Sequence, residues 1–108
     1  MSLNQVNVID VWNNSFTTEF GKSTEEGGIR ALKSLKAATK ALKENKVDVL
    51  VTAPIDKHNI QSESFKFPGH TDYLSNELGG KSLMFMIAEE LKVGLLTDHV
   101  PVSEVAQL

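Results

Sequence analysis

The chain has 108 residues, of which 41% are hydrophobic and 23% are charged, and it contains no cysteine. This length predicts one small domain over residues 1–108, and the absence of cysteine excludes a disulfide framework, a thiolate nucleophile and a cysteine-based zinc site. The formal net charge of -3 argues against nucleic-acid binding, which requires a basic surface.

The N-terminal residues show no signal-peptide pattern, and no apolar run approaches the roughly 20 residues of a membrane helix. We therefore expect a cytoplasmic protein without nucleic-acid or membrane partners. Residues 1–3 (MSL) are typical of an expression-vector remnant, although a natural start has the same appearance. Residues 6–12 (VNVIDVW) alternate apolar and polar side chains with two exceptions, which predicts an early strand.

The next segment carries the strongest helix pattern in the sequence. Ser23 and Glu26 have the spacing of a capping box, which predicts that the helix is capped at Ser23. An apolar stripe follows at steps of three and four residues, formed by Ile29, Leu32, Leu35, Ala38 and Leu42. The lysines over residues 33–46 fit the solvated face of this helix. Gly27 and Gly28 each cost the helix about 1 kcal/mol relative to alanine, so we expect the close approach of another backbone or a ligand.

Residues 47–51 (VDVLV) form a short β-branched run after the helix, which predicts a central strand of an α/β unit. Ligands of open α/β sheets bind at the carboxyl ends of the strands, so residues 52–57 are the first candidate site. Lys57 in this loop has the charge to neutralise a phosphate or to tune a neighbouring acid. An exposed, solubilising lysine explains the same residue equally well.

Residues 73–78 predict a short helix in the second half of the chain. A Pro-Gly turn precedes it, Thr71 or Asp72 is expected to cap it, and a Gly-Gly pair ends it. The sequence from Gly69 to Asp72 places an imidazole, that of His70, beside a hydroxyl and a carboxylate. Helix N-termini favour anions, so this group points to a phosphate or carboxylate site. The alternative is that Thr71 or Asp72 only caps the helix and that His70 is an exposed loop residue.

Two apolar runs, residues 82–88 and 91–97, predict an antiparallel hairpin, although the first run also fits a buried helix. Residues 102–108 are typical of the opening turns of a helix and carry no stop signal, so we interpret the chain as a piece of a longer protein. Together the elements predict an α/β fold, with a partial, mixed sheet and flanking helices.

Asp98 and His99 stand at the end of the second hairpin strand. A neutral imidazole at that place is a common metal ligand, and Asp98 is suited to be a second ligand or to orient the ring. One histidine does not hold a metal, and the sequence leaves open whether His70 and His99 converge in space. No G-x-G-x-x-G motif is present, so the chain lacks a dinucleotide-binding fingerprint.

Three short blocks of the sequence occur in an order and at a spacing that resemble those of the 4-hydroxythreonine-4-phosphate dehydrogenase family of pyridoxal phosphate biosynthesis. The blocks are TAPIDK at residues 52–57, PGHTDY at residues 68–73 and TDHVP at residues 97–101. Each block is unspecific alone, whereas the ordered set is specific. The resemblance covers residues 5–108 and corresponds to a middle segment of a much longer enzyme.

The resemblance implies NAD-dependent oxidation of 4-phosphooxy-threonine, followed by decarboxylation to 3-amino-2-oxopropyl phosphate. It implies a two-domain α/β homodimer that resembles isocitrate and isopropylmalate dehydrogenases, with a divalent cation (zinc, magnesium or cobalt) in the cleft. His70 and Thr71 match the family's substrate-binding pair, and His99 matches the first of three metal-binding histidines. Lys57 matches a recurrent lysine near the site, to which we assign a substrate-positioning role.

The sequence departs from the family pattern because two metal histidines and the cofactor-binding region have no counterpart in it. We therefore expect the isolated chain to be inactive, and NAD and metal to bind only to the full-length enzyme. The general acid or base and the identity of the metal are not determined by these residues. A second hypothesis is a free-standing, non-catalytic binding or assembly module derived from the family. A third is a different phosphate-binding α/β enzyme, whose phosphate-ester binding would survive His99→Ala.

Overall fold

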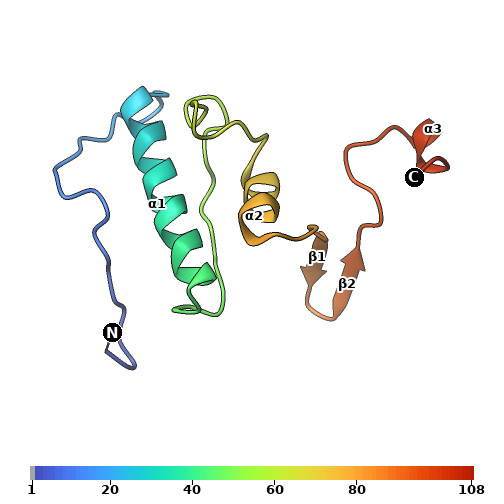
Figure 1. Ribbon diagram of the computed structural model, residues 1–108, viewed down its shortest axis with the longest axis horizontal. Helices are drawn as coiled ribbons and strands as arrows, with labels where there is room; N and C mark the ends of the chain where they lie inside the picture. Colours follow the sequence, from blue (N-terminus) through green and yellow to red (C-terminus); the bar gives the residue numbers. More distant parts are fainter. Residues whose placement is uncertain (1) are drawn as a thin grey trace.

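The computed structural model describes residues 2–108, which form three helices and one small sheet (Figure 1). The elements are α1 (Glu25–Lys43), α2 (His70–Leu78), β1 (Phe85–Ala88), β2 (Leu91–Gly94) and α3 (Val102–Val105). The predicted α/β class is confirmed in that the chain contains both helices and strands. The predicted mixed sheet is not present within residues 2–108, where β1 and β2 form a two-stranded antiparallel sheet.

Helix α1 is capped one residue later than the capping-box pattern predicts. Thr24 has extended backbone angles, and its side-chain oxygen accepts a hydrogen bond from the backbone N–H of Gly27 at 3.2 Å. The prediction that Ser23 caps the helix is wrong, because the hydroxyl of Ser23 donates to the carboxylate of Asp56. A charged acceptor makes the stronger hydrogen bond, and the neighbouring threonine is free to take over the cap.

The N-terminal segment is attached to α1 through the buried side chain of Arg30. The guanidinium carbon lies 5.2 Å from the ring centroid of Trp12 and 4.7 Å from that of Phe16. The same guanidinium donates to Glu26 at 2.6 Å and to the side-chain oxygen of Asn14 at 3.1 Å. Ion pairing and cation–π contact therefore satisfy a charge that is only 5% exposed.

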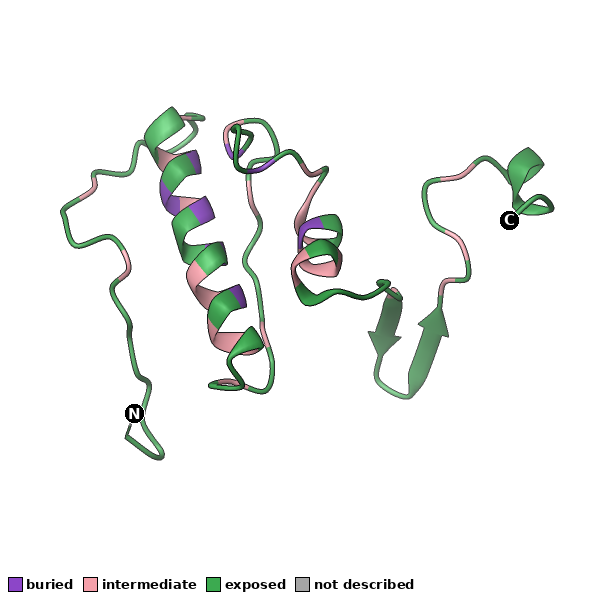
Figure 2. Ribbon diagram, in the orientation of Figure 1, coloured by how far each residue is buried: buried purple, intermediate pink, exposed green. Residues whose placement is uncertain are grey.

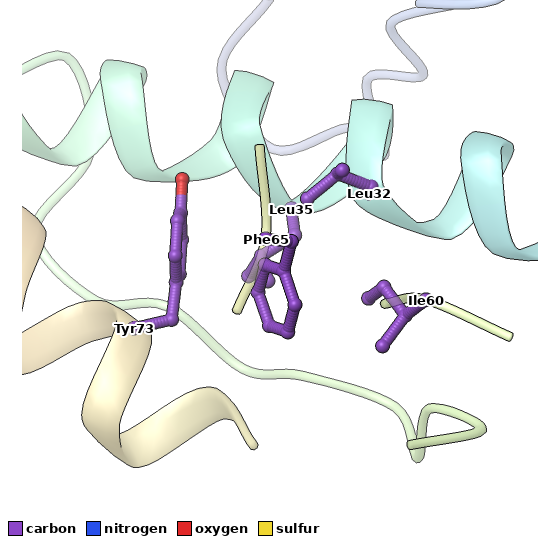
Figure 3. Close-up of a cluster of buried hydrophobic side chains, with 5 residues drawn as sticks. All are labelled: Leu32, Leu35, Ile60, Phe65 and Tyr73. Atoms are coloured by element: carbon purple, nitrogen blue, oxygen red, sulfur yellow. The ribbon is translucent and has the colours of Figure 1, made fainter. Parts of the chain in front are cut away.

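The hydrophobic core lies between α1, α2 and the loop that joins them (Figure 3). Its buried side chains are Leu32, Leu35, Ile60, Phe65 and Tyr73. The ring centroid of Phe65 lies 5.3 Å from that of Tyr73 and 5.4 Å from that of Phe67, so three aromatic rings form one cluster. The predicted stripe of α1 is confirmed at its middle, whereas Ile29 is 48% exposed. The lysines of α1 are exposed, as predicted.

Residues 6–12 and 47–51 form no β-strand, so both strand predictions are wrong for the described chain. A strand requires hydrogen bonds to a neighbouring strand, and neither segment has such a neighbour within residues 2–108. The apolar side chains that the pattern assigned to a sheet interior are exposed, among them Val6 at 94% and Val51 at 89%. The β-branched residues of these segments are typical of strands in a buried sheet, and residues 2–108 contain no neighbouring strand with which they could pair.

Helix α2 begins at His70, three residues earlier than predicted. Its N-cap is Gly69, which has no side chain to accept a hydrogen bond, so the prediction that Thr71 or Asp72 caps the helix is wrong. Both residues lie inside the first helical turn instead. Gly79 ends the helix with a left-handed backbone (φ 71°), as the Gly-Gly pair predicts.

The predicted hairpin is confirmed, with strands shorter than the two apolar runs. Phe85 lies opposite Gly94 and Ala88 lies opposite Leu91, which leaves two glutamates in the turn. Helix α3 confirms the helical start predicted after residue 101. No helix within residues 2–108 is long and apolar enough to cross a membrane.

The described chain exposes far more surface than a compact domain of its size. Its accessible area is 9272 Å², whereas size scaling gives about 6,000 Å² for a folded protein of 11.9 kDa. Its radius of gyration is 16.9 Å, against about 13 Å for a compact domain of this length. Figure 2 shows buried residues on α1, α2 and the loop between them, while both strands are exposed on every residue.

Candidate functional site

A hollow of about 250 Å³ lies between α1 and residues 50–55, and His70 lines it. From α1, the side chains of Ala31, Ser34, Leu35 and Ala38 line the hollow. His70 is half-buried because it occupies the first residue of α2, whose inner face packs on the core. The structure therefore brings the loop after residue 51 and the first site histidine to one concavity, which is mostly apolar with a few polar groups.

Lys57 and Thr71 do not line this hollow, but each is close in sequence to a residue that does, Lys57 to Ile55 and Thr71 to His70. A side-chain carbon placed on Gly69 would lie 3.7 Å from Cε of Lys57, so the lysine stem passes directly beside the residue before His70. Thr71 follows in the first turn of α2 and is exposed. A cationic side chain, an imidazole and a hydroxyl thus gather at a helix N-terminus, where backbone N–H groups favour a negatively charged ligand.

His99 lies apart from this group, in the segment that follows β2 on the far side of the hairpin from α1 (Figure 1). Its side chain is 94% exposed, and its Nε2 lies 3.2 Å from a carboxylate oxygen of Asp98. Residues 2–108 contain no group of three histidine, cysteine, aspartate or glutamate side chains that could hold a metal ion. An imidazole is a suitable metal ligand, but one such ligand does not complete a site.

The loop that carries Lys57 is held against the N-terminus of α1. Asp56 accepts hydrogen bonds from the Ser23 hydroxyl and from the backbone N–H of His58, the latter at 2.8 Å. The side-chain amide of Asn59 donates to the carbonyl of Thr24 at 2.9 Å. The Ser23 hydroxyl, followed by the two loop N–H groups, lowers the pKa of the Asp56 carboxyl below its ordinary value.

Asp56→Asn is expected to lower the thermal midpoint at neutral pH. The substitution replaces the ionised carboxylate, which accepts these hydrogen bonds, with a neutral amide that accepts them more weakly. The folded-state pKa of Asp56 is depressed, so its contribution to stability is present above the unfolded pKa of about 4 and is lost as pH falls through the folded value. The difference between the thermal midpoints of the two proteins should therefore shrink as the pH is lowered from neutral through the acid range.

The control for this substitution is Asp48→Asn, since Asp48 is exposed and carries no hydrogen bond or ion pair within residues 2–108. Its thermal midpoint should follow that of the unsubstituted protein at every pH. If the midpoints of Asp56→Asn and the unsubstituted protein do not draw closer as the pH falls, the role given to the Asp56 carboxylate is wrong.

Sequence reasoning did not single out two side chains that organise this loop, Asn59 and Gln61. Both act through hydrogen bonds to backbone carbonyls. Asn59 binds a carbonyl 35 residues away and Gln61 binds carbonyls four and six residues away, and no short motif encodes such bonds. The one usable signal was Gly28, whose place in a first helical turn predicted a close backbone approach. That prediction is confirmed, because a side-chain carbon on Gly28 would lie 2.5 Å from the carbonyl carbon of Asn59.

The model of one protein family, described as pyridoxal phosphate biosynthetic protein PdxA, matches residues 1–108. The chain belongs to this family. The resemblance that the TAPIDK, PGHTDY and TDHVP blocks indicated is therefore confirmed at the level of the family. No solved structure gave a significant match to the chain.

Several relatives are named 4-hydroxythreonine-4-phosphate dehydrogenase. The relative from Bacteroides thetaiotaomicron is 44% identical over 105 residues, which cover 95% of this chain and 29% of the relative. Those from Sulfurihydrogenibium sp. and Helicobacter pylori are 41% and 34% identical and cover 81% and 85% of this chain. The chain therefore spans less than a third of the length of these relatives.

Proposed function

We propose that residues 1–108 are a middle segment of an NAD-dependent, divalent-metal-dependent dehydrogenase of vitamin B6 biosynthesis. The full-length protein would oxidise 4-phosphooxy-threonine and release 3-amino-2-oxopropyl phosphate after decarboxylation. Membership of the PdxA family and the names of the relatives support this reaction. The observation that carries it for this chain is the gathering of His70, Thr71 and Lys57 at one helix N-terminus beside a hollow.

In this proposal the segment supplies the part of the site that binds the substrate. His70 and Thr71 donate hydrogen bonds to the anionic end of the substrate, and the first-turn N–H groups of α2 add to that binding. The Lys57 ammonium neutralises charge on the same side and positions the substrate. His99 is one ligand of the divalent cation, and the missing ligands, like the NAD site, belong to the rest of the full-length protein.

The excess surface of the segment supports its place within a larger protein. Large apolar side chains are exposed on the segment before α1, on the segment after it and on the hairpin, among them Val8, Val51 and Ile87. So many exposed apolar side chains indicate a surface that other parts of a protein cover. We propose that the rest of the full-length chain covers them and that the complete enzyme is a homodimer with an isocitrate dehydrogenase-like fold.

A dehydrogenase assay tests this function directly. The full-length protein that carries this segment should reduce NAD in the presence of 4-phosphooxy-threonine and a divalent cation, as measured by NADH absorbance. Residues 1–108 alone should give no NADH, because they contain one of the metal ligands and no dinucleotide fingerprint.

A full-length protein that binds the phosphorylated substrate without producing NADH would contradict the proposed reaction. Binding that is unchanged by His99→Ala, together with absent NADH formation, would favour a different phosphate-binding enzyme. NADH formation by residues 1–108 alone would contradict the assignment of this chain as a partial site.

A further inference from the structure

The side-chain amide of Gln61 joins the two loops of the candidate site. Its Nε2 donates to the carbonyl of Lys57 at 3.1 Å and to the carbonyl of Phe67 at 2.8 Å. The first carbonyl belongs to the residue whose stem passes beside Gly69, and the second lies three residues before His70. One NH₂ group with two donors thus uses both of them on the backbone that leads to the site.

The start of α2 needs such a connection because no side chain caps it. Gly69 is extended (φ -178°) and contributes no side-chain hydrogen bond to the first turn. On the core side, the ring of Phe67 packs against Tyr73 with their centroids 5.5 Å apart. On the solvent side, the Gln61 amide donates a hydrogen bond to the Phe67 carbonyl. Within residues 2–108 no other side chain forms a hydrogen bond with residues 67–69.

The backbone of Gln61 is itself well anchored. The preceding residue, Ile60, is 1% exposed, and its N–H donates to the carbonyl of Asp56 at 3.2 Å. The following residue, Ser62, exchanges two backbone hydrogen bonds of 3.1 Å with Phe65, which is fully buried. A side chain on a fixed backbone can transmit that fixed position to the groups it binds.

We propose that Gln61 is a positioning residue, which fixes Lys57 relative to His70 and Thr71 so that the three can bind one anionic substrate group together. This inference rests on the proposed function. Gln61 does not touch the substrate. It acts through the two carbonyls that it binds, so its loss separates the binding groups without removing any of them.

The first test is Gln61→Met in the full-length protein, since methionine keeps the length of the side chain and lacks both donors. The KM for 4-phosphooxy-threonine should rise by about 5- to 30-fold, the effect of losing up to two hydrogen bonds, while kcat stays within about twofold. The KM for NAD should be unchanged, and the thermal midpoint should fall only slightly, because both lost hydrogen bonds lie at the surface. The control is Glu63→Gln in the same loop, whose exposed carboxylate makes no hydrogen bond or ion pair within residues 2–108.

The second test does not depend on the dehydrogenase reaction. Lys57-His58 is the one Lys-His step in residues 1–108. Protein with ¹³C-carbonyl lysine and ¹⁵N-histidine gives an amide signal for the Lys57 carbonyl, which is identified in the full-length protein as the signal that Lys57→Arg removes. In the absence of substrate, this signal should shift in Gln61→Met and stay in place in Glu63→Gln.

An unshifted carbonyl signal, or a shift equal to that of Glu63→Gln, would overturn the positioning role whatever the reaction is. A KM that does not change in an active enzyme would overturn it as well. If the unsubstituted protein produces no NADH, the proposed function fails, whereas the carbonyl signal still decides whether Gln61 holds the loop.

Discussion

Gly28→Ala is expected to destabilise the protein by about 3 kcal/mol, the upper end of the cost of overpacking. The added carbon would lie 2.5 Å from the carbonyl carbon of Asn59 and closer still to its oxygen. Both are backbone atoms, so no side-chain rotation relieves the clash, and either α1 or the loop must move. Urea denaturation should show the loss as a lower midpoint with an unchanged slope.

Gly27→Ala is the matched control, because it places the same methyl group one residue earlier in the same helical turn. Its new carbon would lie 3.0 Å from the Thr24 hydroxyl and 3.7 Å from the side-chain amide of Asn59. Crowding of the cap offsets the helix propensity that alanine gains, so the change should stay within about 1 kcal/mol. Equal effects of the two substitutions would show that propensity, rather than the approach of Asn59, decides the cost at Gly28.

The elements that sequence reasoning predicted are those whose causes are local. Helix α1 is encoded by an apolar stripe in which Leu32 and Leu35 are three residues apart. The end of α2 is encoded by Gly79, which can adopt the left-handed backbone. The hairpin follows from two apolar runs and a two-residue turn. Each pattern reports on neighbours a few residues away, which the described chain contains.

The predictions that failed depend on distant partners. Residues 47–51 have a strand composition, but a strand exists only beside another strand, and none is paired with it in residues 2–108. Ser23 and Thr24 compete for one cap, and the choice is made by Asp56, 33 residues away from Ser23. A local pattern cannot contain that competitor.

The same distinction applies to the candidate site. The rule that ligands gather after α/β strands pointed to residues 52–57, and the structure places Thr52 to Ile55 in the hollow that His70 lines. The bridge made by Gln61 was not foreseeable, because its two acceptors are backbone carbonyls that every residue type possesses.

Phe65→Ala is expected to cost about 3–5 kcal/mol, a large part of the roughly 5–15 kcal/mol that stabilises a small domain. Phe65 is fully buried, and its ring centroid lies 5.3 Å from that of Tyr73 and 5.4 Å from that of Phe67. Only four other buried apolar side chains form this core within residues 2–108, so removing the ring takes away a large part of its buried apolar surface (Figure 3). Urea denaturation followed by circular dichroism measures the loss.

In residues 1–108, Phe20→Ala removes the same group from a side chain that is 94% exposed, and its cost there should stay within about 0.5 kcal/mol. Similar losses for the two substitutions would contradict the core described between α1 and α2. Phe65 also holds Tyr73, and through it the helix that begins at His70. In the full-length protein, Phe65→Ala should therefore weaken substrate binding at temperatures where the protein is still folded, because His70 is no longer fixed against residues 50–55.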